Sequence, residues 1–243
     1  MIEPSGETQQ QSMRRAATLT ALAGISHAVL FLIAFGLLST VPGAHASDAE
    51  ILAYYDSPES RRVLVIGLYI MPFAAIAFLW FIVALRLWVR AAVASTRRDE
   101  LSAEVQLVSG VLYLGLFLVA AAAISSTAAT VEITEAPITA VEARILPGFG
   151  STLLTVLAMR MAAVFVIAST RVASRTDFMP RWMIYAGYAV GIFLLLSITL
   201  SPLLIIVFPI WMIVLCLLLL QRARQIPHHV KMPVNPISRP DVQ

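Results

Sequence analysis

Six apolar segments, each about as long as a membrane-spanning helix, constrain this chain more than any other feature. A helix needs about 20 apolar residues to cross the hydrocarbon core of a bilayer. The segments cover residues 17–38, 63–85, 105–124, 150–170, 183–200 and 203–220. A backbone in lipid must satisfy its own hydrogen bonds, and these runs are continuous rather than alternating, so they predict helices and not a β-barrel.

The composition agrees with this interpretation. Hydrophobic residues make up 59% of the chain and charged residues 13%, whereas an average soluble domain has about 45–50% and about 25%. The single cysteine, Cys216, excludes an internal disulfide. The net charge is +3, but the cations cluster at the ends of apolar segments, so we expect no nucleic-acid partner. The predicted fold is an all-α, polytopic membrane bundle of six transmembrane helices.

The charges between the segments predict an orientation. Most cations lie in the N-terminal tail, the 86–100 and 171–181 loops and the C-terminal tail: Arg14, Arg15, Arg86, Arg90, Arg97, Arg98, Arg171, Arg175, Arg181, Arg222, Arg224, Lys231 and Arg239. The intervening loops contain Arg61, Arg62 and Arg144 and are acidic, with Asp48, Glu50, Asp56, Glu59, Glu132, Glu135 and Glu142. Since cytoplasmic connections carry the excess of Lys and Arg, we expect both termini in the cytoplasm.

Three regions follow from this assignment. Residues 1–15 form a cytoplasmic tail, residues 16–222 form the six-helix domain with acidic external loops at 41–62 and 128–148, and residues 223–243 form a disordered cytoplasmic tail. Ala44-His45-Ala46 resembles a signal-peptide cleavage site. The preceding apolar run exceeds the usual length of about 7–15 residues, so we expect the first segment to be retained.

The external loops contain helix signals of their own. Ser47 and Glu50 have the spacing of a capping box, and Ser57-Pro58 is typical of a helix start with proline at its first position. We therefore expect a short surface helix that leads into an extended second span. In the other loop, residues 138–146 predict a short helix that Pro147-Gly148 would stop.

Arg160 is the strongest candidate functional residue. It lies in the middle of the apolar segment 150–170, and no apolar segment contains a carboxylate at matching depth. A charge near mid-bilayer costs about 2.5–3.5 kcal/mol on insertion scales, so such residues usually have a partner or a function. Helical side chains lean toward the helix N-terminus, so we expect the guanidinium to point toward the external side.

Three kinds of partner suit the Arg160 guanidinium. One is a carboxylate from the external loop, namely Glu132, Glu135 or Glu142. A second is an anionic ligand or lipid head group, which arginine binds in a bidentate manner. A third is a backbone carbonyl, such as those released by Pro72 and Pro209. An internal clamp and an anion-binding site both remain open.

Other polar and small residues lie within the apolar segments. His27 is expected to be neutral and to bond a neighbouring helix, while Gln106, Ser109 and Tyr113 share one helical face that favours helix-to-helix hydrogen bonds over a conduction path. Gly187 and Gly191 form a G-x-x-x-G motif that permits close helix packing, within the bundle or between protomers.

The sequence contains no recognisable catalytic or metal-binding constellation. Nucleophile-elbow, zinc-protease and phosphate-loop motifs are missing. The adjacent His228 and His229 are poor evidence for a metal site without further ligands. We therefore expect no catalytic residue, metal or cofactor, and an enzyme is the least favoured class.

Several short motifs together resemble uncharacterised six-span integral membrane proteins of actinobacteria. They are residues 144–148 (RILPG), 159–165 (MRMAAVF), 180–182 (PRW) and 208–211 (FPIW). The similarity covers about residues 15–222. It implies a fold and a location in the cell membrane, but no activity, cofactor or catalytic residue.

Two functional hypotheses follow. The first is a non-enzymatic accessory or assembly protein, in which Arg160 is neutralised internally or by a partner. The second is a binding protein or facilitator for an anionic solute or lipid, with Arg160 as the counter-charge. The expected partners are accordingly the lipid bilayer, an anionic lipid or solute, and another membrane subunit.

Overall fold

The computed structural model is a bundle of long helices. It describes residues 6–43, 45–92, 97–135, 137–174, 179–197 and 202–225. In chain order the helices are α1 (Gly6–Leu38), α2 (Asp48–Asp56), α3 (Pro58–Ala92), α4 (Arg97–Thr134), α5 (Ala140–Thr152), the π-helical segment η1 (Leu153–Ala158), α6 (Met159–Ala173), α7 (Arg181–Leu196) and α8 (Pro202–Gln225).

The all-α class and the membrane character of the chain are confirmed. Five stretches within the described helices are long and apolar enough to cross a bilayer: Arg14–Leu38, Pro58–Leu87, Glu100–Thr134, Ala140–Ala173 and Leu204–Arg222. Large apolar side chains such as Tyr69, Phe73 and Trp80 are exposed on the outside of the bundle, where lipid would solvate them.

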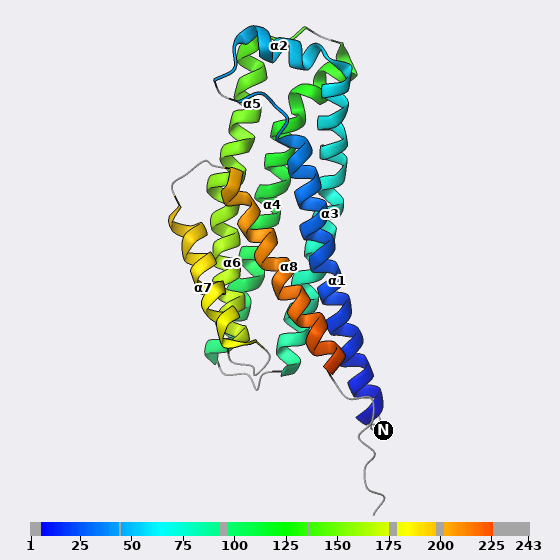
Figure 1. Cartoon of the computed structure of the whole chain (residues 1–243), viewed down its shortest axis with the longest axis vertical. Helices are drawn as coiled ribbons and strands as arrows, with labels where there is room; N and C mark the ends of the chain where they lie inside the picture. The colour runs from blue at the N-terminus through cyan, green and yellow to red at the C-terminus, as the bar shows by residue number, and fades with distance from the viewer. Residues whose placement is uncertain are drawn as a thin grey trace, which may run out of the picture.

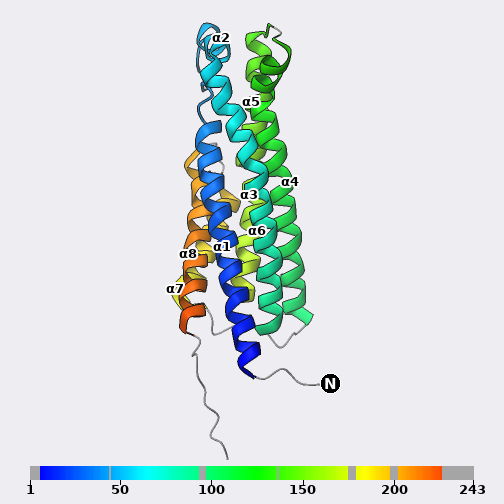
Figure 2. The same cartoon turned by 90° about the vertical axis from the view of Figure 1, so that its right-hand side faces the viewer.

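The bundle is elongated (Figures 1 and 2), and its two ends differ in the charged residues that they carry. We call one end the basic end; it holds Arg14, Arg86, Arg171, Arg181 and Arg222, near the ends of five helices. The other, the acidic end, is formed by α2, the start of α3, the end of α4 and the start of α5, and holds Asp48, Glu50, Glu59, Glu132 and Glu142. Helix α1 begins and α8 ends at the basic end (Figure 1).

The predicted surface helix is present at the acidic end. Ser47 caps α2: its hydroxyl accepts from the Glu50 amide, and the Glu50 carboxylate accepts from the Ser47 amide at 2.7 Å. Those bonds from Ser47 lower the pKa of Glu50. Helix α3 then begins at Pro58, as the sequence predicted.

The prediction that Pro147 stops a helix is wrong. Helix α5 continues through Pro147, and α5, η1 and α6 form one uninterrupted rod, Ala140–Ala173. A proline in a helix removes one hydrogen bond, here the one to the Ala143 carbonyl. Pro147 is buried and α5 packs closely against α4 at Gly150, where a Cβ would lie 2.6 Å from the Ala120 carbonyl. Tertiary packing therefore maintains the helix despite the lost bond.

The predicted loops and tails are more helical than expected. Helix α4 extends to Thr134 and α5 starts at Ala140, so most of the 128–148 segment is helical. At the termini, α1 begins at Gly6 and α8 reaches Gln225, inside the predicted 1–15 and 223–243 tails. Residues 1–5 and 226–243, including His228 and His229, lie outside the described residues.

Helix α7 is shorter than the segment predicted at 183–200. It has 16 residues and ends at Leu196, and residues 198–200 lie outside the described part. Its length is about 24 Å at a rise of about 1.5 Å per residue, against about 30 Å of hydrocarbon. Gly187 and Gly191 face α6, since a Cβ on them would lie 2.1 Å from Thr170 and 2.4 Å from Ile167. This glycine motif therefore serves packing within the bundle.

Candidate functional site

Arg160 is half-buried and lies part-way along the rod formed by α5, η1 and α6. At about 1.5 Å per residue it is about 24 Å along the rod from Arg144 and about 17 Å from Arg171. The segment just before it, η1, is a π-helix of six residues. Such segments are rare and disturb the regular pairing of backbone groups. Arg160 therefore sits where its own helix is irregular.

Backbone carbonyls surround the Arg160 guanidinium. One terminal nitrogen donates to the Val156 carbonyl at 2.7 Å and lies 3.4 Å from the Thr155 carbonyl, both in η1. The other terminal nitrogen donates to the Ser197 carbonyl at 2.9 Å. The side chain thus leans toward the N-terminus of its helix, as predicted. The guanidinium of Arg160 therefore connects η1 to Ser197, which lies 37 positions later in the chain than Arg160.

Ser197 is the C-cap of α7, and this position explains the contact. The last carbonyls of a helix have no partner within the helix and carry a partial negative charge. Because α7 is shorter than the hydrocarbon core, its C-terminus lies beside Arg160, far from the acidic end of the bundle. A cation there satisfies an exposed carbonyl and interacts favourably with the helix dipole.

The three predicted loop carboxylates lie elsewhere. Glu132 pairs with Arg61 at 3.0 Å, and the Glu142 carboxylate accepts from the Thr139 amide at 2.9 Å in the capping box of α5. Glu135 is exposed, with a backbone φ of 52°. Within the described part of the chain, no ion pair of Arg160 is found and no bond joins it to the carbonyls released by Pro72 or Pro209.

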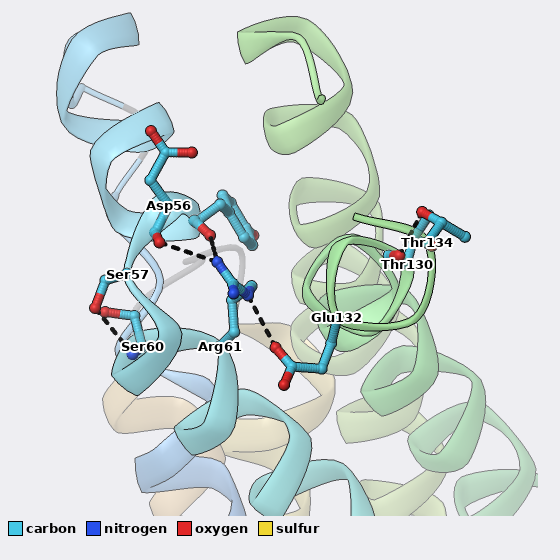
Figure 3. A network of polar contacts seen from close by, with 8 residues as sticks. Asp56, Ser57, Ser60, Arg61, Thr130, Glu132 and Thr134 are labelled. Atoms are coloured by element: carbon cyan, nitrogen blue, oxygen red, sulfur yellow. Dashed lines mark hydrogen bonds and ion pairs between the residues drawn. The ribbon is translucent and has the colours of Figure 1, made fainter. Parts of the chain in front are cut away.

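Two further arginines hold backbone carbonyls at the acidic end. Arg61 donates to the carbonyls of Tyr55 and Asp56 at 2.6 and 3.0 Å, at the C-terminus of α2, while its Nε binds Glu132 on α4 (Figure 3). Arg144 on α5 donates to the Ala46 carbonyl at 2.7 Å and pairs with Asp48 at 2.6 Å, at the N-terminus of α2. An arginine from a neighbouring helix therefore binds α2 at each of its two ends.

No role was predicted for Arg61 and Arg144 from the sequence. The signal that would have found them is the charge bias itself, because they are cations in loops that are otherwise acidic.

Between the contacts of these two arginines, Tyr55 of α2 is fully buried. Burial, together with the neighbouring Tyr54, raises the pKa of Tyr55 to about 12, so its phenol stays neutral.

A cavity of about 700 Å³ lies beneath α2. Its wall includes residues from the end of α1, the 39–43 loop, α2, α4, α5, η1 and the first turn of α8, and most of these residues are apolar. Arg144 lines it near the acidic end, and Thr155 lines it at the depth of the Arg160 contacts. Arg160 itself does not line it. No pattern in the sequence predicts this cavity.

The intramembrane polar residues form short contacts between helices. His27 Nδ1 lies 2.8 Å from the Ala74 carbonyl of α3, and its Nε2 lies 3.4 Å from the Tyr113 hydroxyl of α4. Gln106 on α4 donates to the Ser169 hydroxyl of α6 at 3.0 Å. Ser109 instead donates to Val105 in its own helix at 2.6 Å. These residues do not converge on Arg160 or on the cavity.

No group of three or more metal-ligating side chains occurs among the residues that the structure describes. Comparisons with family models, with curated proteins and with solved structures found no match to this chain.

Proposed function

We propose that this protein is a multi-pass protein of the cytoplasmic membrane that acts as a non-enzymatic accessory or assembly protein. In this proposal the six predicted helices all enter the bilayer: α1, α3, α4 and the rod of α5, η1 and α6 cross it, and α7 and α8 form a hairpin that turns back inside the hydrocarbon core. The basic end, with both termini, faces the cytoplasm. The gathering of cations at that end supports this orientation. The resemblance to a six-span actinobacterial family stays a prediction within this proposal.

The observation that carries the proposal is that backbone carbonyls of the protein itself accept the hydrogen bonds of Arg160. Both terminal nitrogens of its guanidinium donate to backbone carbonyls. One of these carbonyls belongs to Ser197, the C-cap of α7, which ends part-way along the length of the bundle. A charge that the fold itself compensates has a structural reason to be there. It is therefore poor evidence for a substrate or an ion pathway.

Replacing Arg160 by leucine tests the clamp. The variant should lose about 2–3 kcal/mol of unfolding free energy, because the carbonyls of Val156 and Ser197 lose a charged donor. The buried Cys216 offers a natural reporter, since a thiol-reactive fluorophore will label it only on unfolding. Arg171→Leu, an exposed cation of the same helix, is the matched control and should stay within about 0.5 kcal/mol. An Arg160→Leu protein as stable as the parent would overturn the clamp.

Native mass spectrometry of the full chain, extracted from its membrane in mild detergent, tests the accessory role. A second subunit at fixed stoichiometry supports the proposal. A chain that carries only a small amphiphile, and no protein partner, overturns it in favour of the second candidate function.

The second candidate function is a binding protein or facilitator for an anionic solute or lipid. The cavity beneath α2 favours it, because its volume of about 700 Å³ is in the range of about 300–1,000 Å³ typical of ligand sites. Arg160 does not line the cavity, and its two shorter bonds go to Val156 and Ser197, which do not line it either. Arg144 is therefore the better counter-charge for this function.

A further inference from the structure

The cavity beneath α2 has the depth of one leaflet of a bilayer. Arg144 lines it at the acidic end and Thr155 lines its deep end. The two residues are eleven positions apart on one rod, which is about 17 Å at a rise of about 1.5 Å per residue. This distance is about half of the roughly 30 Å hydrocarbon core. A chain-like molecule anchored at Arg144 would therefore end near mid-bilayer.

The hairpin formed by α7 and α8 is shorter than the rod beside it, and this difference in length leaves room for the cavity beneath α2. Helix α7 ends at the depth of Arg160, and Ile205 in the first turn of α8 lines the deep part of the cavity. Figure 1 shows both helices stopping well below the acidic end of the bundle. Helix α8 contacts η1, but the part of the rod above it, α5, has little contact with this hairpin, and the cavity lies along that part.

The backbone of the cavity wall is irregular in a way that leaves room and polar groups. Pro147 lines the cavity and withholds a hydrogen bond from the Ala143 carbonyl, and Ala143 lines it as well. A Cβ placed on Gly148 would meet nothing within 4 Å, so the wall is open there. The π-helical residues Leu154 and Thr155 form the deep part. Such irregular helices are frequent at functional sites.

Charge and polarity are distributed as an amphiphile requires. Of the described residues that line the cavity, Arg144 alone is charged, and it lies at the end nearest α2. Its partner Asp48 is largely exposed, with 73% of its side chain accessible, so an incoming anion can compete for the guanidinium. Toward the other end Phe35, Ile124 and Leu154 are apolar, and the hydroxyls of Thr152 and Thr155 there donate to carbonyls of their own helix.

From this arrangement we infer that the cavity binds a single-chain anionic amphiphile. Its carboxylate or phosphate head group lies at Arg144 beneath α2, and its aliphatic chain runs along α5 and η1 toward Ile205. This inference rests on the second candidate function and names its site and its ligand class. Arginine binds either head group through two parallel hydrogen bonds, and the chain gains the hydrophobic contacts of the apolar lining.

Photolabelling of the purified full chain tests this inference. The probe is a palmitate analogue with a diazirine at its methyl end, and the labelled residues are mapped by mass spectrometry. We expect saturable labelling near Leu154, Thr155 and Ile205. Unlabelled palmitate and lysophosphatidylglycerol should compete, and lysophosphatidylcholine, which has no net charge, should compete at least tenfold less well.

Two pairs of variants distinguish the effects of the Arg144 charge and of the cavity volume from a general loss of structure. Arg144→Gln should reduce labelling at least tenfold, whereas Asp48→Asn, which breaks the same ion pair and keeps the cation, should leave it unchanged or raise it. Gly148→Leu should reduce labelling at least tenfold by filling the cavity. The matched control is Gly115→Leu, which also adds a side chain in open space but lies outside the cavity lining, and it should label like the parent.

The possible failures are distinguishable. Labelling that does not saturate, or that spreads over the lipid-facing side of α7, overturns the inference. If inorganic phosphate binds with an Arg144-dependent affinity while both anionic amphiphiles fail to compete, the inference falls and an anionic solute remains the ligand. If neither phosphate nor any amphiphile binds, the second candidate function falls with it.

Discussion

His27 shows how one polar side chain is accommodated inside an apolar bundle. Its ring is fully buried, and its Nδ1 bonds the Ala74 carbonyl of a neighbouring helix at 2.8 Å. Aromatic rings surround it, with Phe78 at 4.7 Å and Tyr113 at 6.0 Å between centroids. A single short hydrogen bond and close ring packing therefore fix its position.

We expect substitutions of His27 and of its neighbour Tyr113 to lower the unfolding free energy by different amounts. His27→Leu should lower the unfolding free energy by about 1 kcal/mol, because it loses one short hydrogen bond while nearly keeping the side-chain volume. Tyr113→Phe should cost less, about 0.5 kcal/mol, since its hydroxyl lies 3.4 Å from His27 Nε2, too far for a strong bond. Thermal unfolding in detergent measures both. A larger loss for Tyr113→Phe than for His27→Leu would contradict this ranking.

The contact between α4 and α5 depends on the absence of a side chain at one residue. A Cβ on Gly150 would lie 2.6 Å from the Ala120 carbonyl and 2.9 Å from the Ile124 amide nitrogen. Both are backbone atoms of a long helix, which cannot move aside as a flexible side chain can. The two helices therefore approach closely only because residue 150 is glycine.

We predict that Gly150→Ala destabilises the bundle by about 1–3 kcal/mol through this overpacking. The matched control is Gly115→Ala on α4, where a Cβ would meet nothing within 4 Å. It should be neutral or stabilising by about 0.5–1 kcal/mol, because alanine favours the helix over glycine. Unfolding followed through Cys216 labelling measures both variants, and equal effects at the two positions would refute the packing argument.

Local signals in the sequence predicted the helix starts better than the helix ends. The capping box at Ser47 and Pro58 at the start of α3 depend on residues close in sequence, and both predictions are confirmed. The stop predicted at Pro147 failed because α4 packs against that turn, which no local pattern reveals. The end of α7 before residue 200 was missed for the same reason, since the donor to its last described carbonyl is Arg160, far away in sequence.

For the candidate site, the sequence identified the unusual residue and, as one of three alternatives, backbone carbonyls as its partners, but not which carbonyls these are. Arg160 stood out because its charge conflicts with its apolar segment. The irregular η1 segment, which supplies one carbonyl, has no sequence pattern that distinguishes it from an ordinary helix. The cavity was equally invisible, because it results from a short hairpin beside a long rod. Such differences in helix length appear only when the helices are assembled.

At the scale of the whole molecule, the charges at the two ends predict which side of the membrane each end faces. Cytoplasmic connections carry the excess of Lys and Arg, so the acidic end with α2 should lie outside. Two exposed positions report on this, Ala53 in α2 and Ser174 after α6, and the buried Cys216 of the parent protein provides a silent background. Neither substitution by cysteine alters a charge, so the charge bias that is being tested is preserved.

A membrane-impermeant maleimide should label Ala53→Cys in intact cells and Ser174→Cys only after the cells are permeabilised. The physical reason is that the two residues lie at opposite ends of a rod of helices longer than the bilayer is thick: α4 alone has 38 residues, about 57 Å, against roughly 30 Å of hydrocarbon. The reverse pattern would place both termini outside. Labelling of both variants in intact cells would mean that the bundle does not cross the membrane, because a lipid-spanning arrangement must hide one of its ends from the reagent.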